Sequence, residues 1–190
     1  VNGEVDLWET PAVDMVPILR NNGEIKVEVI DPLGTQGWLR PNHLHPPFDN
    51  PKARQALLYA VNQEEYLQAI VGDPGLYKVC PAYFICGTPN ESDVGTKALS
   101  DVNKEKAKAL LKEAGYKGEK IIMMQPTDIP VLNNATLVTA QLLRDIGMNV
   151  EVQAMDWSTL TSRRAEKKKP SEGGWNIFHT YATGADATSP

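Results

Sequence analysis

Two histidines and two cysteines are the side chains that could bind a metal or form a covalent bond. His43 and His45 flank a single leucine, so both side chains could face one side of an extended segment. They supply only two ligands, whereas a metal site usually takes at least three from the protein. We therefore favour a solvated loop pair. The alternative is a freestanding α/β metal-dependent hydrolase domain that uses His43 and His45.

Cys80 and Cys86 enclose five residues in a segment rich in turn-forming residues. This spacing is longer than the roughly two to four residues of a zinc half-site, and the sequence holds no further cysteine to complete one. A disulfide is the favoured interpretation. A disulfide that closes so short a loop would stabilise the folded protein by about 2 kcal/mol. Its presence would imply an oxidising compartment. Two unpaired thiols remain the alternative, because a sequence does not give the geometry of the Cβ atoms.

No catalytic motif accompanies these residues. The sequence contains neither a Gly-rich dinucleotide or phosphate loop nor a Gly-x-Ser-x-Gly elbow, and no pair of carboxylates stands out by its spacing. His179 falls in a predicted strand, where a hydrogen-bonded structural histidine is favoured over a general base. We expect no cofactor, no resident metal and no enzymatic activity.

The composition and net charge indicate which classes of partner are not expected. The 190 residues are 42% hydrophobic and 23% charged, as in ordinary globular domains. No run approaches the roughly 18 to 20 apolar residues of a membrane helix, so we expect no stable insertion into a membrane. Lys and Arg number 19 against 24 Asp and Glu, a net charge of −5, whereas nucleic-acid binders carry a basic excess. Nucleic acid is therefore not expected as a partner.

Hydrophobic periodicity predicts strands that alternate with helices. The predicted strands cover residues 3–8, 25–30, 36–42, 119–125, 149–155 and 175–181. The predicted helices cover residues 12–20, 51–61, 63–70, 103–114, 131–146 and 157–168, and a long surface loop is expected over 77–100. Such alternation favours βαβ units, and hence an α/β fold with a parallel or mixed sheet flanked by helices.

Four stretches resemble one protein family. Residues 42–60 read Asn-His-Leu-His-Pro-Pro-Phe-Asp-Asn-Pro-Lys-Ala-Arg-Gln-Ala-Leu-Leu-Tyr-Ala, which is similar to the signature of the extracellular solute-binding proteins of peptide-type ABC importers, family 5. Residues 103–116 resemble the amphipathic helix and glycine stop of that family. Residues 142–152 resemble the helix and strand that follow, and residues 175–190 resemble its late strand and ligand loop. The resemblance covers nearly the whole chain.

The resemblance implies a fold and a domain organisation. Family members are much longer, and the chain starts without an initiator Met and stops in a turn, so we expect a fragment equivalent to the C-terminal lobe. This lobe would be of the periplasmic-binding-protein type II-like kind. Residues 1–190 would form one α/β unit, with a subdivision into a strand-rich entry segment, 1–42, and a body of helices and strands, 43–190.

The resemblance also implies a function. The protein would capture peptides or similar small solutes in a cleft between two lobes and deliver them to ABC permease subunits, in the periplasm or at the extracellular face of the membrane. Its ligand loop points to Tyr181, Thr183, Gly184 and Asp186 as binding residues. Asp186 matches by position the acidic residue that holds the α-ammonium group of the ligand in peptide-binding members. The alternative for Asp186 is an aspartate that organises its own turn.

Overall fold

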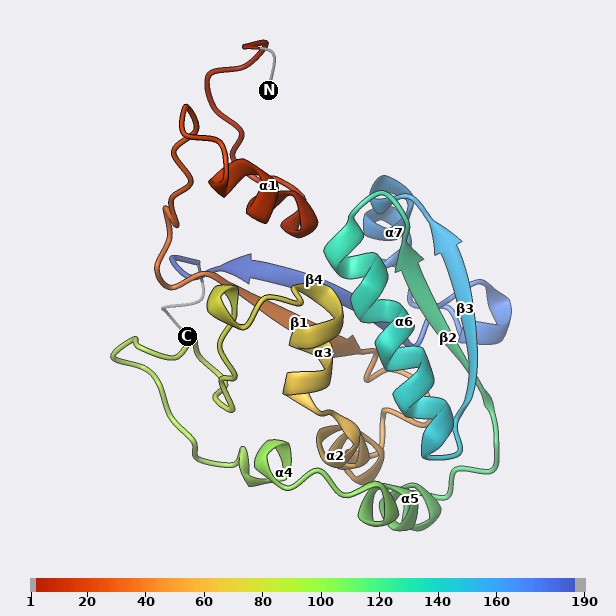
Figure 1. Cartoon of the computed structure of the whole chain (residues 1–190). Coiled ribbons are helices and arrows are strands. Elements are labelled where there is room, and N and C mark those ends of the chain that lie inside the picture. The colour runs from red at the N-terminus through yellow and green to blue at the C-terminus, as the bar shows by residue number, and fades with distance from the viewer. Residues whose placement is uncertain (1–2, 187–190) are drawn as a thin grey trace.

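Four strands form one mixed sheet in the computed structural model, which describes residues 3–186 (Figure 1). The strands are β1 (Thr35–Pro41), β2 (Lys120–Pro126), β3 (Asn149–Met155) and β4 (Ile177–Thr183), in the spatial order β1-β4-β2-β3. β4 runs parallel to β2, and β2 parallel to β3, whereas β1 runs antiparallel to β4. The predicted α/β fold with a mixed sheet flanked by helices is confirmed.

The helices in the described part of the chain lie on both faces of this sheet. They are α1 (Val16–Arg20), α2 (Pro51–Ala60), α3 (Gln63–Ile70), α4 (Lys97–Ser100), α5 (Lys104–Glu113), α6 (Pro130–Asp145) and α7 (Trp157–Arg163), with short 3-10 turns at Val13–Met15, Pro74–Leu76 and Pro170–Glu172. No helix within residues 3–186 has the length and apolar character needed to cross a bilayer.

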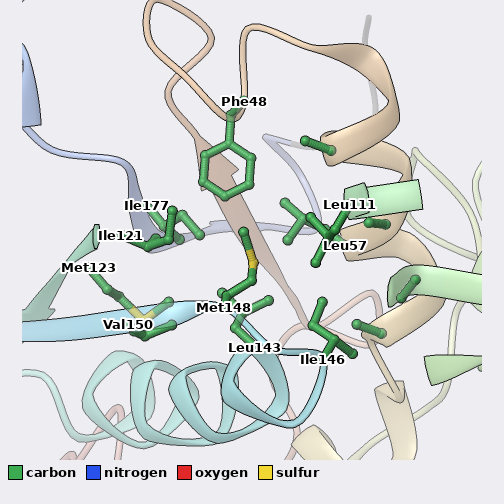
Figure 2. Close-up of a cluster of buried hydrophobic side chains, with 14 of the residues drawn as sticks. Phe48, Leu57, Leu111, Ile121, Met123, Leu143, Ile146, Met148, Val150 and Ile177 are labelled. Carbon is green, nitrogen blue, oxygen red and sulfur yellow. The ribbon is translucent and has the colours of Figure 1, made fainter. Parts of the chain in front are cut away.

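Two hydrophobic clusters fill the two faces of the sheet. Neighbouring residues of a strand point to opposite faces, so Met123 joins the cluster that includes α6, whereas Met124 joins the cluster that includes α7. Figure 2 shows the larger cluster, in which Phe48 and Leu57 point toward the strands from the proline-rich tract and from α2. Phe48 is fully buried. The tract of residues 42–60, which resembles the family signature, therefore contributes side chains to the core.

Local signals explain why most helices begin and end where they do. The Asn50 side chain accepts a hydrogen bond from the backbone N–H of Lys52, and Asn62 and Asn103 cap α3 and α5 in the same way. Gly115, with a φ of 81°, directly follows the C-cap residue of α5. These elements, together with β3, lie close to their predicted positions because their signals are local.

Two of the predicted strands are wrong. Residues 3–8 and 25–30 are not strands, and Val5, Val29 and Ile30 are 71%, 68% and 73% exposed. An alternating pattern becomes a strand only when a neighbouring strand satisfies its backbone, and no such partner lies beside these segments within residues 3–186. Among the described residues of the entry segment 1–42, β1 is the one strand.

The end of α7 and the segment 77–100 also differ from the prediction. α7 ends at Arg163 and not near residue 168, because the chain turns back there and the Arg163 guanidinium donates to the carbonyls of Gly173 and Gly174. The segment 77–100, predicted as a loop throughout, contains the single helical turn of α4. The large-scale topology is unaffected by either change.

Candidate ligand-binding site

The carboxyl-terminal edge of the sheet is where a ligand site is expected. β2, β3 and β4 are parallel, so their ends at Pro126, Met155 and Thr183 point the same way. In open α/β sheets, ligands bind outside the carboxyl ends of the strands. The four predicted ligand residues all lie at or just beyond the end of β4. The sheet therefore places these four residues at its carboxyl-terminal edge, where open α/β sheets bind ligands.

Tyr181 presents an aromatic ring at this edge. Its side chain is 43% exposed, and its partner across the ladder in β1 is Gly37. Gly37 has no side chain, so the residue directly opposite Tyr181 does not cover the ring. An uncovered aromatic face can pack against an apolar group or a cation of a ligand.

Thr183 and Asp186 close a turn that directly follows β4. The Thr183 hydroxyl donates to Asp186 Oδ2 at 2.8 Å, and the Asp186 backbone N–H donates to Thr183 Oγ1 at 3.4 Å. Thr183 is the side-chain partner of the Asp186 carboxylate within residues 3–186, and Asp186 is exposed. A carboxylate oriented by one hydroxyl keeps the capacity to accept further hydrogen bonds, for example from an ammonium group.

Gly184 is buried in a close contact between two backbone segments. Its N–H donates to the Gly34 carbonyl at 2.7 Å, and a Cβ atom built on it would lie 2.2 Å from Leu33 Cβ. No side chain fits there. Gly184 therefore brings the end of β4 against the turn before β1, and this contact places the Asp186 turn.

A buried polar network lies beneath Tyr181 on the same face of β4. His179 Nε2 and the Tyr66 hydroxyl each lie 2.6 Å from Thr139 Oγ1, which joins β4 to α6 and α3. Burial lowers the pKa of His179 to about 4, although a hydrogen bond to the Trp38 backbone acts in the opposite direction. Burial also raises the pKa of Tyr66 to about 12. Both side chains are therefore neutral at pH 7, and the network is structural.

The histidine pair gains no support as a metal site. His45 Nε2 lies 2.9 Å from the backbone carbonyl of Lys167, and His43 has a pKa that is lowered by partial burial and by the charge of Arg54. A guanidinium beside His43 disfavours a bound cation. No group of three or more His, Cys, Asp or Glu that could hold a metal occurs among residues 3–186.

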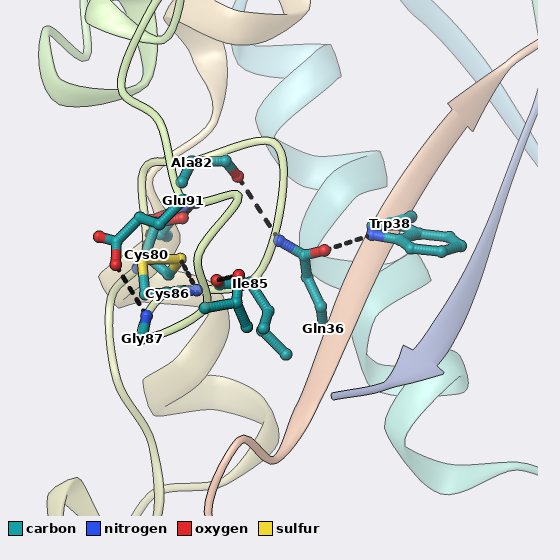
Figure 3. Close-up of a disulfide and its surroundings, with 10 residues drawn as sticks. Gln36, Trp38, Cys80, Ala82, Ile85, Cys86, Gly87 and Glu91 are labelled. Atoms are coloured by element: carbon teal, nitrogen blue, oxygen red, sulfur yellow. Dashed lines mark hydrogen bonds between the residues drawn. A yellow bond between two sulfur atoms is a disulfide. The ribbon is translucent and has the colours of Figure 1, made fainter. Parts of the chain in front are cut away.

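The cysteine pair forms a disulfide. Cys80 and Cys86 are bonded, with Cα atoms 5.8 Å apart, so the favoured interpretation holds and the alternative of two free thiols does not. Figure 3 shows this loop beside β1, with the Gln36 side chain between the loop residue Ala82 and the Trp38 indole. No sequence pattern predicts this contact, because it joins segments far apart in the chain.

A surface groove of about 460 Å³ lies elsewhere, between the proline-rich tract and the end of α5. Its lining includes Pro47, Tyr116 and Glu119. Glu119 directly precedes β2, so this groove sits at the amino-terminal edge of the parallel strands. It is therefore not part of the candidate site.

The fold is that of a lobe of the periplasmic-binding-protein type II-like kind. Solved structures support this class. A substrate-binding protein of an ABC transporter from Listeria monocytogenes superposes with a TM-score of 0.67 at 21% identity, over 89% of this chain and 38% of that one. The ABC transporter-associated periplasmic binding protein DppA of Helicobacter pylori, in complex with the peptide STSA, gives a TM-score of 0.63 at 22% identity, over 91% of this chain and 31% of that one. At these identities the likeness concerns the fold.

The chain belongs to the bacterial extracellular solute-binding proteins, family 5, whose middle-region model matches residues 1–189. A probable peptide ABC transporter periplasmic-binding protein, y4tO of Sinorhizobium fredii, is 41% identical over 181 residues, which is 94% of this chain and 34% of that protein. The glutathione-binding protein GsiB of Escherichia coli K12 is 30% identical, over 88% of this chain and 31% of that protein.

The family membership confirms the predicted resemblance, and its description as extracellular agrees with the predicted location. The chain spans about a third of the length of these relatives. These relatives are named as binding proteins, so the hydrolase alternative built on His43 and His45 finds no support. The assignment to the C-terminal lobe in particular stays a prediction.

Proposed function

We propose that this chain forms one wall of the ligand cleft in a solute-binding protein that delivers peptides, or similar small solutes with a free amine, to the permease subunits of an ABC importer. Family membership and the lobe-like fold support the transport role. The whole protein would act as a binding component without enzymatic activity, since capture and release need no nucleophile and no general base.

The observation that carries the choice of ligand is the place of Asp186. Its carboxylate is exposed, is oriented by Thr183, and follows the end of β4 at the carboxyl-terminal edge of the sheet. Tyr181, which is 43% exposed, lies near the same end of β4. An exposed carboxylate suits an α-ammonium group through a charge-assisted hydrogen bond, and an exposed aromatic ring can contact a cation.

Closure of a second lobe over this edge would complete the site. Periplasmic binding proteins close by a hinge around their ligands, and closure removes water from the cleft. An ion pair strengthens as water leaves, because the local dielectric constant falls. The closed form would then have the higher affinity and would be the form that the permease distinguishes.

The choice between a peptide and another amine is open to experiment, because relatives differ in the ligand that they are named for. y4tO is named for peptides and GsiB for glutathione. Both kinds of ligand carry an α-ammonium group, so both would use Asp186. Mass spectrometry of the small molecule that copurifies with the full-length protein would identify which is bound.

The test of this role is Asp186→Asn in the full-length protein, with the tetrapeptide Ser-Thr-Ser-Ala and glutathione as probes in isothermal titration calorimetry. Losing a hydrogen bond to a charged group costs about 1.5 to 3 kcal/mol, so the affinity should fall by about 10- to 100-fold while the melting temperature hardly changes. N-acetylation of the peptide should remove most of the difference between the two proteins.

Asp101→Asn is the matched control, because Asp101 is also an exposed carboxylate and lies at the end of α4, in a different part of the fold. It should leave the affinity unchanged. Equal affinities of the wild type and Asp186→Asn for the probe that binds would contradict the proposal that Asp186 binds the α-ammonium group of the ligand. Binding of neither probe, together with a copurified solute that lacks an amine, would overturn the proposed ligand class.

A further inference from the structure

The loop that contains the Cys80–Cys86 disulfide is fastened to the helical layer at one end. The Gln63 side chain of α3 accepts from the Cys80 backbone N–H at 3.1 Å and donates to the Cys80 carbonyl at 2.9 Å. Within the loop, the Cys86 N–H points at Cys80 Sγ, 3.1 Å away, and Ile85 is 5% exposed. The bridged segment is therefore anchored and does not hang free in solvent.

The other side of this loop meets the beginning of β1. A Cβ atom built on Gly87 would lie 3.9 Å from Leu33 Cδ2, so the loop backbone passes next to the Leu33 side chain. Gln36 Nε2 approaches the Ala82 carbonyl at 3.5 Å, a weak polar contact, while Gln36 Oε1 accepts from the Trp38 indole at 2.9 Å (Figure 3). Leu33 and Gln36 are both half-buried.

Leu33 also contacts the turn after β4, where the candidate ligand residues lie. Its Cβ faces the position where Gly184 has no side chain, and the Gly34 carbonyl accepts from the Gly184 N–H. Gly184 lies in the turn whose ends are Thr183 and Asp186. A continuous set of contacts thus runs from the disulfide loop through Leu33 and Gly34 to the Asp186 turn.

We propose that the Cys80–Cys86 loop is a positioning element of the ligand site, which holds Leu33 and Gln36 so that the turn bearing Asp186 keeps its binding geometry. This inference rests on the proposed function for its link to ligand affinity. The support of the turn by the loop is a separate claim, and it can be tested without any ligand.

The end of a two-stranded ladder needs such support. The register of β4 with β2 includes Met123 and Met124, whereas its last residues pair with β1. Ladder ends and the turns beyond them open at low free energy unless other contacts hold them. A displacement of about 1 Å in a binding group can remove much of its interaction. Fixing Leu33 from the loop side therefore affects how well Asp186 is placed.

The first experiment replaces the bridge by Cys80→Ala/Cys86→Ala in the ligand-free full-length protein and measures hydrogen–deuterium exchange by mass spectrometry. Exchange in peptides that cover 33–37 and 180–186 should rise by about 3- to 10-fold, because local opening becomes less costly, while the β3 peptide 149–155 keeps its protection. Intact mass should show that the wild type has lost two hydrogens. Unchanged exchange at 180–186 would overturn the proposal.

Tyr77→Phe is the matched control. It removes hydroxyl contacts of the same long loop with Glu64 and Gln68 of α3, and leaves the contacts with β1 in place. It should not alter exchange at 180–186. An equal rise in this variant would show that any loosening of the loop has the same effect, which would contradict a specific route through Leu33.

The second experiment links the support to the ligand. Calorimetry with Ser-Thr-Ser-Ala should show affinity reduced by about 3- to 10-fold in the double cysteine variant, with N-acetylated peptide nearly unaffected, because the ammonium contact is the one displaced. Leu33→Ala, which keeps the Cβ against Gly184 and loses the contact with Gly87, should have a similar effect. Combined with the cysteine substitutions it should add little further loss.

The outcomes separate this proposal from the proposed function. If the wild type binds neither probe and the copurified solute lacks an amine, the proposed ligand class fails, while the exchange data still decide whether the loop supports the turn. If exchange rises but the affinity for the free-amine probe does not change, the positioning role is overturned and the ligand proposal stands. If the cysteine variant does not fold, Leu33→Ala decides both questions, since it retains the disulfide.

Discussion

The imidazole of His179 lies in the interior, 5% exposed, with Thr139 and Tyr66 as its neighbours. Burial disfavours the charged form, which is why its pKa is lowered from 6.5 to about 4. Between these two pH values the unfolded chain binds a proton that the folded chain does not. The stability that His179 contributes is therefore present above pH 6.5 and is lost as the pH falls toward 4.

We expect the free energy of unfolding to decrease by about 3 kcal/mol from this group between pH 7 and pH 4. Urea denaturation of the wild type and of His179→Gln at both pH values measures the effect, since glutamine carries no charge. The decrease should be smaller in His179→Gln by about the stated amount. Parallel pH dependence in the two proteins would show that His179 is not protonated on unfolding.

Gly184 and Gly37 lie on adjoining strand ends but differ in the space around them. A Cβ atom at Gly184 would meet Leu33 Cβ at 2.2 Å, whereas one at Gly37 would meet no atom within 4 Å. Gly184→Ala should lower the free energy of unfolding by about 1 to 3 kcal/mol, because the backbones must move apart. Gly37→Ala should change it by less than about 0.5 kcal/mol. Thermal melts of both variants test this difference in stability, and equal melting temperatures would refute it.

At the scale of elements, one side chain joins the ends of two helices. Asn50 Oδ1 accepts from the Lys52 N–H at the start of α2, and Asn50 Nδ2 donates to the Ala114 carbonyl at the end of α5. Asn62 caps α3 without a second helix as its partner. The pair of asparagines therefore separates the contribution of a cap from that of a contact between helices.

Asn50→Ala should cost about 2 kcal/mol of stability, and Asn62→Ala about 1 kcal/mol, because the first substitution also leaves the Ala114 carbonyl without its donor. Chemical denaturation of the two variants gives the difference. A cost for Asn62→Ala that equals or exceeds the cost for Asn50→Ala would show that the contact with α5 adds nothing to the cap.

For the molecule as a whole, the two faces of the sheet are filled by residues of this chain. The two buried clusters contain members from α2, α5, α6 and α7. By contrast, the candidate site is a single exposed wall. A cleft buries most of its ligand only when both of its walls are present.

We therefore expect the isolated 190-residue chain to fold but to bind ligand poorly. Circular dichroism should show a cooperative thermal transition, since the chain buries a hydrophobic cluster on each face of the sheet. Calorimetry with Ser-Thr-Ser-Ala should give an affinity at least about 100-fold below that of the full-length protein, because half of the contacts are absent. Equal affinity of the chain and the full-length protein would contradict a site shared by two lobes.

The sequence predicts the secondary-structure elements and the role of the tract 42–60 better than it predicts contacts between distant segments. The bounds of β3 and the caps of α2, α3 and α5 follow from residues within a few positions of each other. The ligand residues were proposed from a family resemblance, and the fold brings them to one edge. The segment 25–30 alternates like a strand and is not one, because no neighbour pairs with it in the described chain.

The features that can be predicted without the fold are therefore local: helix caps, glycine stops, the alternation of β3, and the family resemblance of the tract 42–60. The contacts of Leu33 and Gly34 with Gly184, and of the disulfide loop with Leu33, are visible only in the folded chain. This difference arises because local signals act between neighbours in the chain. The partner of a strand end is selected by the packing of the whole sheet, and adjacent residues do not encode it.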